Sequence, residues 1–167
     1  MDYRASGQTV VWINGFGGAL LTVAGTLAGG FLCDRISRRL AYALTAILMG
    51  VCGAGMMLAP LTQPVFAVGV SLYLVTQGLV YAAYSALLLE LIGAGGRSAA
   101  TRFTLYNAAG NAPVAYMTWL DGQGYKRFGP RGLLGTDALS NLVSAAIFLF
   151  LIRRSLFAAK PMEAVTK

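Results

Sequence analysis

VFAVGVSLYLVTQGLVYAAYSALLLELI, residues 65–92, is a run of apolar and small residues in which Glu90 is the single charged side chain. A helix needs about 20 mostly apolar residues to cross the hydrocarbon core of a bilayer. This segment is long enough, and the whole chain carries only 11% charged residues, too few to cover the surface of a soluble domain. The stretch therefore predicts a transmembrane helix in an integral membrane protein.

Further segments on either side have the same length and apolar character. Charged or turn-forming stretches separate them, such as Asp34 to Arg39 and Pro60 to Pro64. We therefore expect an all-α membrane protein, a single domain over residues 1–167 with about five transmembrane helices. The predicted helices are residues 8–33, 40–59, 65–92, 98–120 and 133–152, and residues 153–167 form a polar C-terminal tail.

Basic residues gather in short clusters between the apolar segments and give a formal net charge of +7. Such clusters are typical of the flanks of spanning helices, so we expect no nucleic-acid partner. Most of the 13 lysines and arginines fall on the side that holds the C-terminus, although Lys126, Arg127 and Arg131 fall on the other. The positive-inside rule then predicts an outside N-terminus and a cytoplasmic C-terminus.

Polar side chains are concentrated in three predicted helices, 8–33, 65–92 and 98–120, and are scarce in 40–59. Polar groups in a bilayer are costly unless they face protein or water. We therefore expect the three polar helices to line a cavity and the helix 40–59 to face lipid. These polar side chains could bind a substrate or form hydrogen bonds between helices. The candidate cavity residues are Asn14, Gln77, Tyr81, Tyr84, Asn107, Asn111 and Tyr116.

Two local features predict how the helices pack. Gly25 and Gly29 are four positions apart, a spacing that lets two helices approach closely in lipid. Pro113 lies inside the predicted helix 98–120, where a proline frees a backbone carbonyl and usually bends the helix.

Residues that could carry enzyme chemistry are few. The chain has no histidine, and Cys33 and Cys52 have a spacing that suits no metal site. Asp137, near the start of the predicted helix 133–152, could cap that helix, join an interfacial pair or serve in coupling. We therefore expect no enzymatic activity, no catalytic residues, no metal and no cofactor.

Residues 30–39, Gly-Phe-Leu-Cys-Asp-Arg-Ile-Ser-Arg-Arg, resemble the signature loop of the major facilitator superfamily. The family has this loop between helices two and three, with a weaker copy between helices eight and nine. Because three predicted helices remain after the one that follows the loop, the chain resembles family helices eight to twelve, a partial major-facilitator bundle. Glu90, six residues and Arg97 resemble a second family motif that pairs with the loop. The resemblance implies a cytoplasmic gate formed by Asp34, Arg35, Arg38, Arg39, Glu90 and Arg97.

Residues 99–138 are similar to the branch that contains muropeptide permeases and acetyl-coenzyme A transporters, through Tyr106-Asn107, Pro113, Tyr116 and residues 119–122. The resemblance implies part of a secondary active transporter of the bacterial inner membrane, which moves a small solute by alternating access, with protons as a symported ion. The expected partners are the lipid bilayer, a small-molecule substrate, and the missing N-terminal half or a second copy. The alternative is an inactive truncated fragment, or one subunit of a split carrier without transport on its own.

Overall fold

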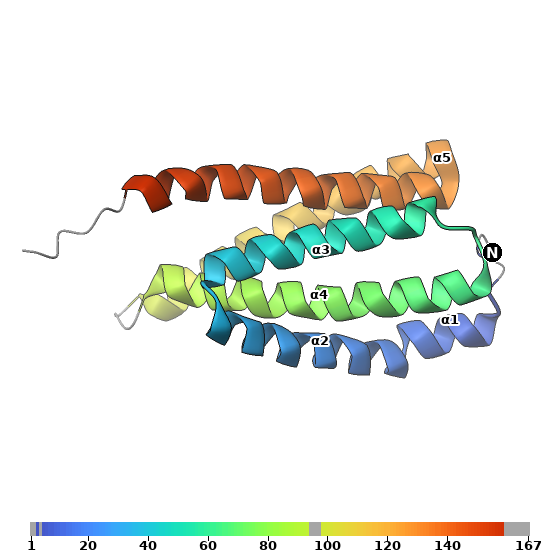
Figure 1. Ribbon diagram of the computed structural model, residues 1–167, viewed down its shortest axis with the longest axis horizontal. Helices are drawn as coiled ribbons and strands as arrows, with labels where there is room; N and C mark the ends of the chain where they lie inside the picture. The colour runs from blue at the N-terminus through green and yellow to red at the C-terminus, as the bar shows by residue number, and fades with distance from the viewer. Residues whose placement is uncertain (1–2, 4, 94–97, 159–167) are drawn as a thin grey trace, which may run out of the picture.

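The computed structural model describes residue 3, residues 5–93 and residues 98–158, with side chains as far as residue 153. Within those ranges the chain is all-helical and has no strand. The helices lie side by side along the long axis of the molecule (Figure 1). They are α1 (Gly7–Asn14), α2 (Phe16–Arg35), α3 (Arg38–Leu58), α4 (Gln63–Ile92) and α5 (Ala99–Ala158).

Four segments of the described chain are long and apolar enough to cross a membrane. This finding agrees with the sequence-based prediction of an integral membrane protein. The predicted helix 8–33 is divided at Gly15 into α1 and α2, although the two together form one candidate span. The four segments are Gly7–Arg35, Arg38–Leu58, Gln63–Ile92 and Ala99–Arg153.

The helix ends follow from local sequence signals. The Ser37 side chain caps α3 by accepting a hydrogen bond from the Leu40 backbone N–H at 3.4 Å. Pro64 occupies the first turn of α4, where its missing N–H removes no helical hydrogen bond. α4 ends at Gly93, whose φ of 74° is in the left-handed region that favours glycine at helix C-termini.

The long helix α5 reverses direction at Gly129, so residues 99–128 and 130–158 form two antiparallel arms (Figure 1). Gly129 has φ 64° and ψ −150°, a conformation available almost only to glycine. Pro130 adds a second constraint, because steric clash with the proline ring disfavours the helical region for the residue before it. The predicted helix ends at residues 120 and 133 differ from the structure, in which helical turns continue up to the reversal on both sides. Helical angles also continue through Pro113.

The helices are held together by close contacts at glycines. In the α2–α4 contact, a Cβ added to Gly25 would overlap the Val75 carbonyl oxygen, and one added to Gly78 would overlap that of Thr22. The Gly25 spacing therefore has the close-approach role that the sequence predicted. α3 approaches the second arm of α5 in the same way, because a Cβ at Gly50 would lie 2.7 Å from a Leu142 side-chain carbon.

α3 is the most covered of the candidate spans, with 39% of its most apolar window buried. It lies between α4 and the second arm of α5, and Ala41, Thr45 and Met56 are buried in these contacts. The opposite stripe, which includes Leu44 and Leu48, is exposed. The prediction that residues 40–59 face lipid therefore holds for one face only. A low number of polar residues therefore does not distinguish a helix that faces lipid from one that is buried among small residues.

Candidate functional site

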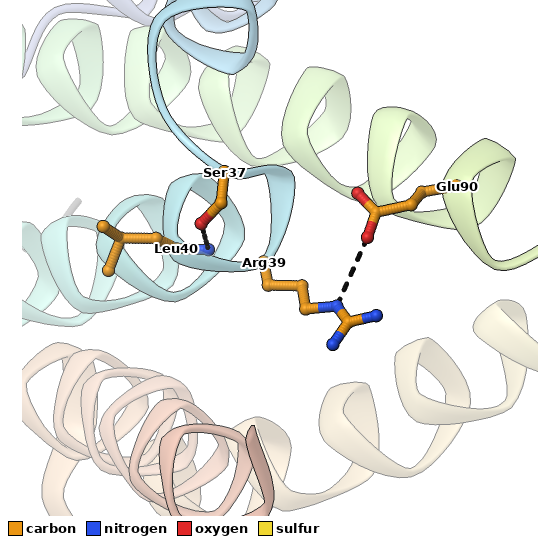
Figure 2. Close-up of polar contacts among 4 residues, drawn as sticks. All are labelled: Ser37, Arg39, Leu40 and Glu90. Carbon is orange, nitrogen blue, oxygen red and sulfur yellow. Dashed lines mark hydrogen bonds and ion pairs between the residues drawn. The ribbon is translucent and has the colours of Figure 1, made fainter. Parts of the chain in front are cut away.

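One end of the bundle carries the ion pair that the sequence resemblance implied. Arg39, in the first turn of α3, points toward Glu90, in the last turn of α4 (Figure 2). The Arg39 Nε lies 3.3 Å from the Glu90 Oε1, and the two side chains are 40% and 35% exposed. A cavity of about 480 Å³ adjoins the pair, and its wall also includes Ser37 and Leu40 and, from α5, Leu149, Ile152 and Arg153. This contact links the α2–α3 connection to the end of α4.

The other predicted gate residues take no part in this pair. Asp34 is exposed, and in the described part of the chain no ion pair joins it to Arg35, Arg38 or Arg39. Arg35 instead places its guanidinium carbon 4.5 Å from the centre of the Phe31 ring, one turn earlier in α2. Arg97 lies outside the described residues. Of the five predicted gate residues that the structure describes, it therefore brings two together in an ion pair, Arg39 and Glu90.

The predicted cavity residues are distributed over several places along the bundle. Tyr84 bridges α4 and the first arm of α5 by donating a hydrogen bond to the Tyr106 carbonyl at 3.2 Å. Gln77 is half-buried on α4. Tyr81, Asn107 and Asn111 are exposed.

The remaining two predicted residues line separate cavities. Asn14 borders a cavity of about 400 Å³ near the start of the chain, together with Tyr3 and Tyr125. Tyr3 is held there by a weak hydrogen bond to the Met56 carbonyl, and burial raises the pKa of its phenol above the ordinary value, although Arg131 opposes that shift. Tyr116 borders a different cavity, which has several polar side chains in its wall and is lined by α3, by Val80 of α4 and by the two arms of α5.

A polar cluster at this second cavity was not predicted from the sequence. Its centre is Asp137, on the second arm of α5. The Tyr73 hydroxyl of α4 donates to Asp137 Oδ2 at 2.8 Å, and the Asn141 amide donates to Oδ1 at 3.2 Å. Asp137 therefore ties the second arm to α4 through side chains, a role different from the helix cap considered from the sequence. Gly53 of α3 lies beside it: a Cβ there would be 3.6 Å from Oδ2, an ordinary contact, and 3.3 Å from the Ala138 Cβ.

The first arm of α5 adds a second carboxylate to the same cavity. Asp121 lines it alongside Asp137, in a volume of about 360 Å³. The Asp121 Oδ1 atom is buried and has no hydrogen-bond partner within the described residues. Among the residues that line this cavity there is no lysine or arginine. The remaining polar lining side chains are Tyr42, Tyr116, Thr118, Ser140, Asn141 and Ser144.

The carboxyl groups in the wall of this cavity can exchange protons, and its hydroxyl and amide groups can form hydrogen bonds with a small polar molecule. No group of three or more His, Cys, Asp or Glu residues that could hold a metal ion occurs in the described ranges. One signal of the cluster is visible in the sequence: Asp137 and Asn141 are four residues apart, about one helical turn. The partnership with Tyr73 and Asp121 depends on how α4 and α5 pack, which no local pattern encodes.

Comparisons of the chain with protein-family models, with curated proteins and with solved structures give no match.

Proposed function

We propose that this chain is part of a secondary active transporter that moves a small solute across the membrane by alternating access. The observation that carries the proposal is the Arg39–Glu90 ion pair at one end of a bundle of apolar helices. It joins the two sequence motifs that resemble those of the major facilitator superfamily. In this proposal the bundle is a partial major-facilitator bundle with five spans, because α5 reverses at Gly129 and supplies two of them.

The proposed orientation places the Arg39–Glu90 end in the cytoplasm of a bacterial cell and the N-terminus outside the inner membrane. The basic residues Arg35, Arg38 and Arg39 lie at this end, as does Arg102 in the first turn of α5. The proposed gate works by pairing the cytoplasmic ends of α3 and α4 in one state and separating them in the other. Protons are the proposed symported ion. The resemblance to muropeptide permeases and acetyl-coenzyme A transporters suggests the solutes to be tested first.

A second candidate function, one subunit of a split carrier or an inactive fragment, is favoured by the first arm of α5. This arm makes few contacts with α4, and polar or aromatic side chains such as Asn107, Asn111 and Tyr116 are exposed on it. Exposed amides are costly in hydrocarbon unless protein or water covers them. A second polypeptide, either an N-terminal half or another copy, would cover this face.

The proposal is tested by uptake into proteoliposomes that contain the purified chain, with peptidoglycan fragments, peptides and acyl-coenzyme A as solutes. Specific uptake driven by a proton gradient would support the transporter. Correctly inserted protein that takes up none of them would favour the split-carrier or fragment alternative. A partner half would then be sought by co-purification.

The ion pair itself is tested by charge reversal in the same assay. A partly exposed pair contributes about 0.2–1 kcal/mol, so Glu90→Gln should change the balance between the two gate states by up to about fivefold. Arg39→Glu should reduce uptake, and Arg39→Glu combined with Glu90→Arg should restore it, because the swapped charges can pair again. Arg102→Gln is the matched control, since Arg102 is an exposed arginine at the same end. Uptake that is indifferent to Arg39→Glu would exclude the gate.

A further inference from the structure

The hairpin in α5 brings two acidic residues into one cavity inside the membrane-spanning bundle. Asp121 and Asp137 lie at equal sequence separation on either side of Gly129, where the chain reverses. The two arms touch between these positions, because a Cβ added to Gly124 would overlap the Thr136 hydroxyl and the Gly132 carbonyl. Both carboxylates line the polar cavity of about 360 Å³.

The surroundings of the two carboxylates are unequal. Asp137 accepts hydrogen bonds from the Tyr73 hydroxyl and the Asn141 amide, one on each carboxylate oxygen. Donors of this kind stabilise the charged form of a carboxylate. In the described part of the chain, no donor forms a hydrogen bond with the Oδ1 atom of Asp121, which is buried. A buried carboxylate oxygen that lacks a hydrogen-bond donor disfavours the charged form of its group.

The other titratable groups around the pair do not supply a positive charge. α4 contributes Tyr73, and α3 contributes Tyr42 to the cavity wall and Cys52 close to Tyr73. Both arms of α5 contribute the two aspartates and neutral polar groups, without lysine or arginine. Two like charges that share a site of low dielectric constant oppose each other's ionisation.

We propose that Asp121 and Asp137 form a proton-binding site in which one proton is held at neutral pH, on Asp121, while Asp137 remains charged. The proton turns the unpartnered Asp121 oxygen from an acceptor into a hydroxyl donor. Its release requires either water entry or separation of the two carboxylates. The step from this site to coupled solute movement rests on the proposed transporter function, whereas proton binding does not.

Infrared spectroscopy of the purified full chain in detergent tests the site, because the C=O stretch of a protonated carboxyl is separate from the carboxylate bands. The chain has only six Asp and Glu residues, and exposed carboxyls ionise near pH 4. We therefore expect a single protonated carboxyl at pH 7 in the wild-type protein. Absence of that band at pH 7 would overturn the proposal without any variant.

Two variants assign the band. Asp121→Asn should abolish it at pH 7, whereas Asp137→Asn should leave it but move its titration to lower pH, since the neighbouring negative charge is gone. Asp121→Glu should retain it and guards against loss through misfolding. Asp34→Asn, at an exposed position in the last turn of α2, should leave the band unchanged. A band that survives Asp121→Asn would overturn the assignment to Asp121.

A sodium ion is the competing occupant, and the same sample distinguishes it. Replacing Na⁺ by N-methylglucamine at constant pH should leave the band unchanged if the site holds a proton. A band that is absent in Na⁺ and grows when Na⁺ is removed would overturn the proton site in favour of an alkali-ion site. These measurements need no solute. A chain that binds the proton but takes up no solute would therefore count against the proposed transport function and leave the proton site standing.

Discussion

The contact between α2 and α4 gives the sharpest test of the packing described above. We predict that Gly25→Ala destabilises the bundle, although alanine is the better helix former. Gly25 faces the backbone of α4, and the added Cβ would lie 2.8 Å from the Val75 carbonyl carbon and closer still to its oxygen. Backbone atoms cannot rotate away, so the two helices must separate. Separation also weakens the neighbouring contact of Gly29 with Ala82.

The magnitude follows from two opposing effects. Overpacking a close-packed interface costs about 1–3 kcal/mol in the free energy of unfolding. Replacing an exposed helical glycine by alanine has the opposite sign and stabilises by about 0.5–1 kcal/mol. Gly30 provides that matched control, because it lies in the same helix and nothing is within 4 Å of its added Cβ. Both variants gain the better helix propensity of alanine, so they should differ by the overpacking cost of about 1–3 kcal/mol, with Gly25→Ala the less stable and Gly30→Ala at or above wild type.

Steric trapping of a doubly biotinylated chain with monovalent streptavidin measures this free energy within a detergent micelle. Biotin sites near the ends of α2 and α4 make the assay report on the contact in question. Equal stabilities for Gly25→Ala and Gly30→Ala would refute the reasoning, since the close approach of the α2 and α4 backbones would then be absent. A parallel gain in both variants would mean that the helix propensity of alanine dominates over the contact.

Two further substitutions test the hairpin and the polar cluster by the same measurement. Gly129→Ala should lower the free energy of unfolding by about 1–3 kcal/mol, because the glycine-only conformation becomes strained. Gly122→Ala is the control, since its Cβ would have open space and its φ is not positive; an equal effect of both substitutions would argue against the chain reversal at Gly129. Tyr73→Phe should cost about 0.6 kcal/mol and at most about 1.7 through loss of the hydrogen bond to Asp137; Tyr81→Phe, at an exposed position on the same helix, should cost nothing measurable.

Much of the helical arrangement could be predicted from residues that act locally. The charged stretch from Asp34 to Arg39 marks the α2–α3 connection, and Pro60 and Pro64 bracket the next one. Each signal acts through its own neighbours, so no knowledge of the tertiary structure was needed. The Gly129–Pro130 pair was equally local, since a glycine followed by proline is a strong turn signal. The predicted helices nevertheless end at residue 120 and begin again at 133, so the prediction misses the helical turns on either side of this pair.

The candidate sites were less accessible from the sequence. Glu90 was associated with the basic loop only through resemblance to a family motif, and the structure pairs it with Arg39 alone among the four loop residues considered. Asp137 was noticed, but its partners lie on α4 and on the other arm of α5. Such contacts depend on helix rotation and on the hairpin register. Hydrophobic periodicity reports which face is polar, yet it does not say which polar faces meet.

The position of the two aspartates has a consequence for how proton binding and helix movement depend on each other. Asp137 is tied to α4 through Tyr73, whereas Asp121 is on the first arm of α5, which has few contacts with α4. Moving that arm away from α4 would separate the carboxylates and remove the repulsion that favours the shared proton. Proton release and arm displacement then favour each other to the same extent, because linkage between two equilibria is reciprocal. The proton can shift the arm only as far as its affinities for the two arrangements differ. The difference between the Asp121 titrations of the wild type and Asp137→Asn therefore sets an upper limit on the driving force at this site.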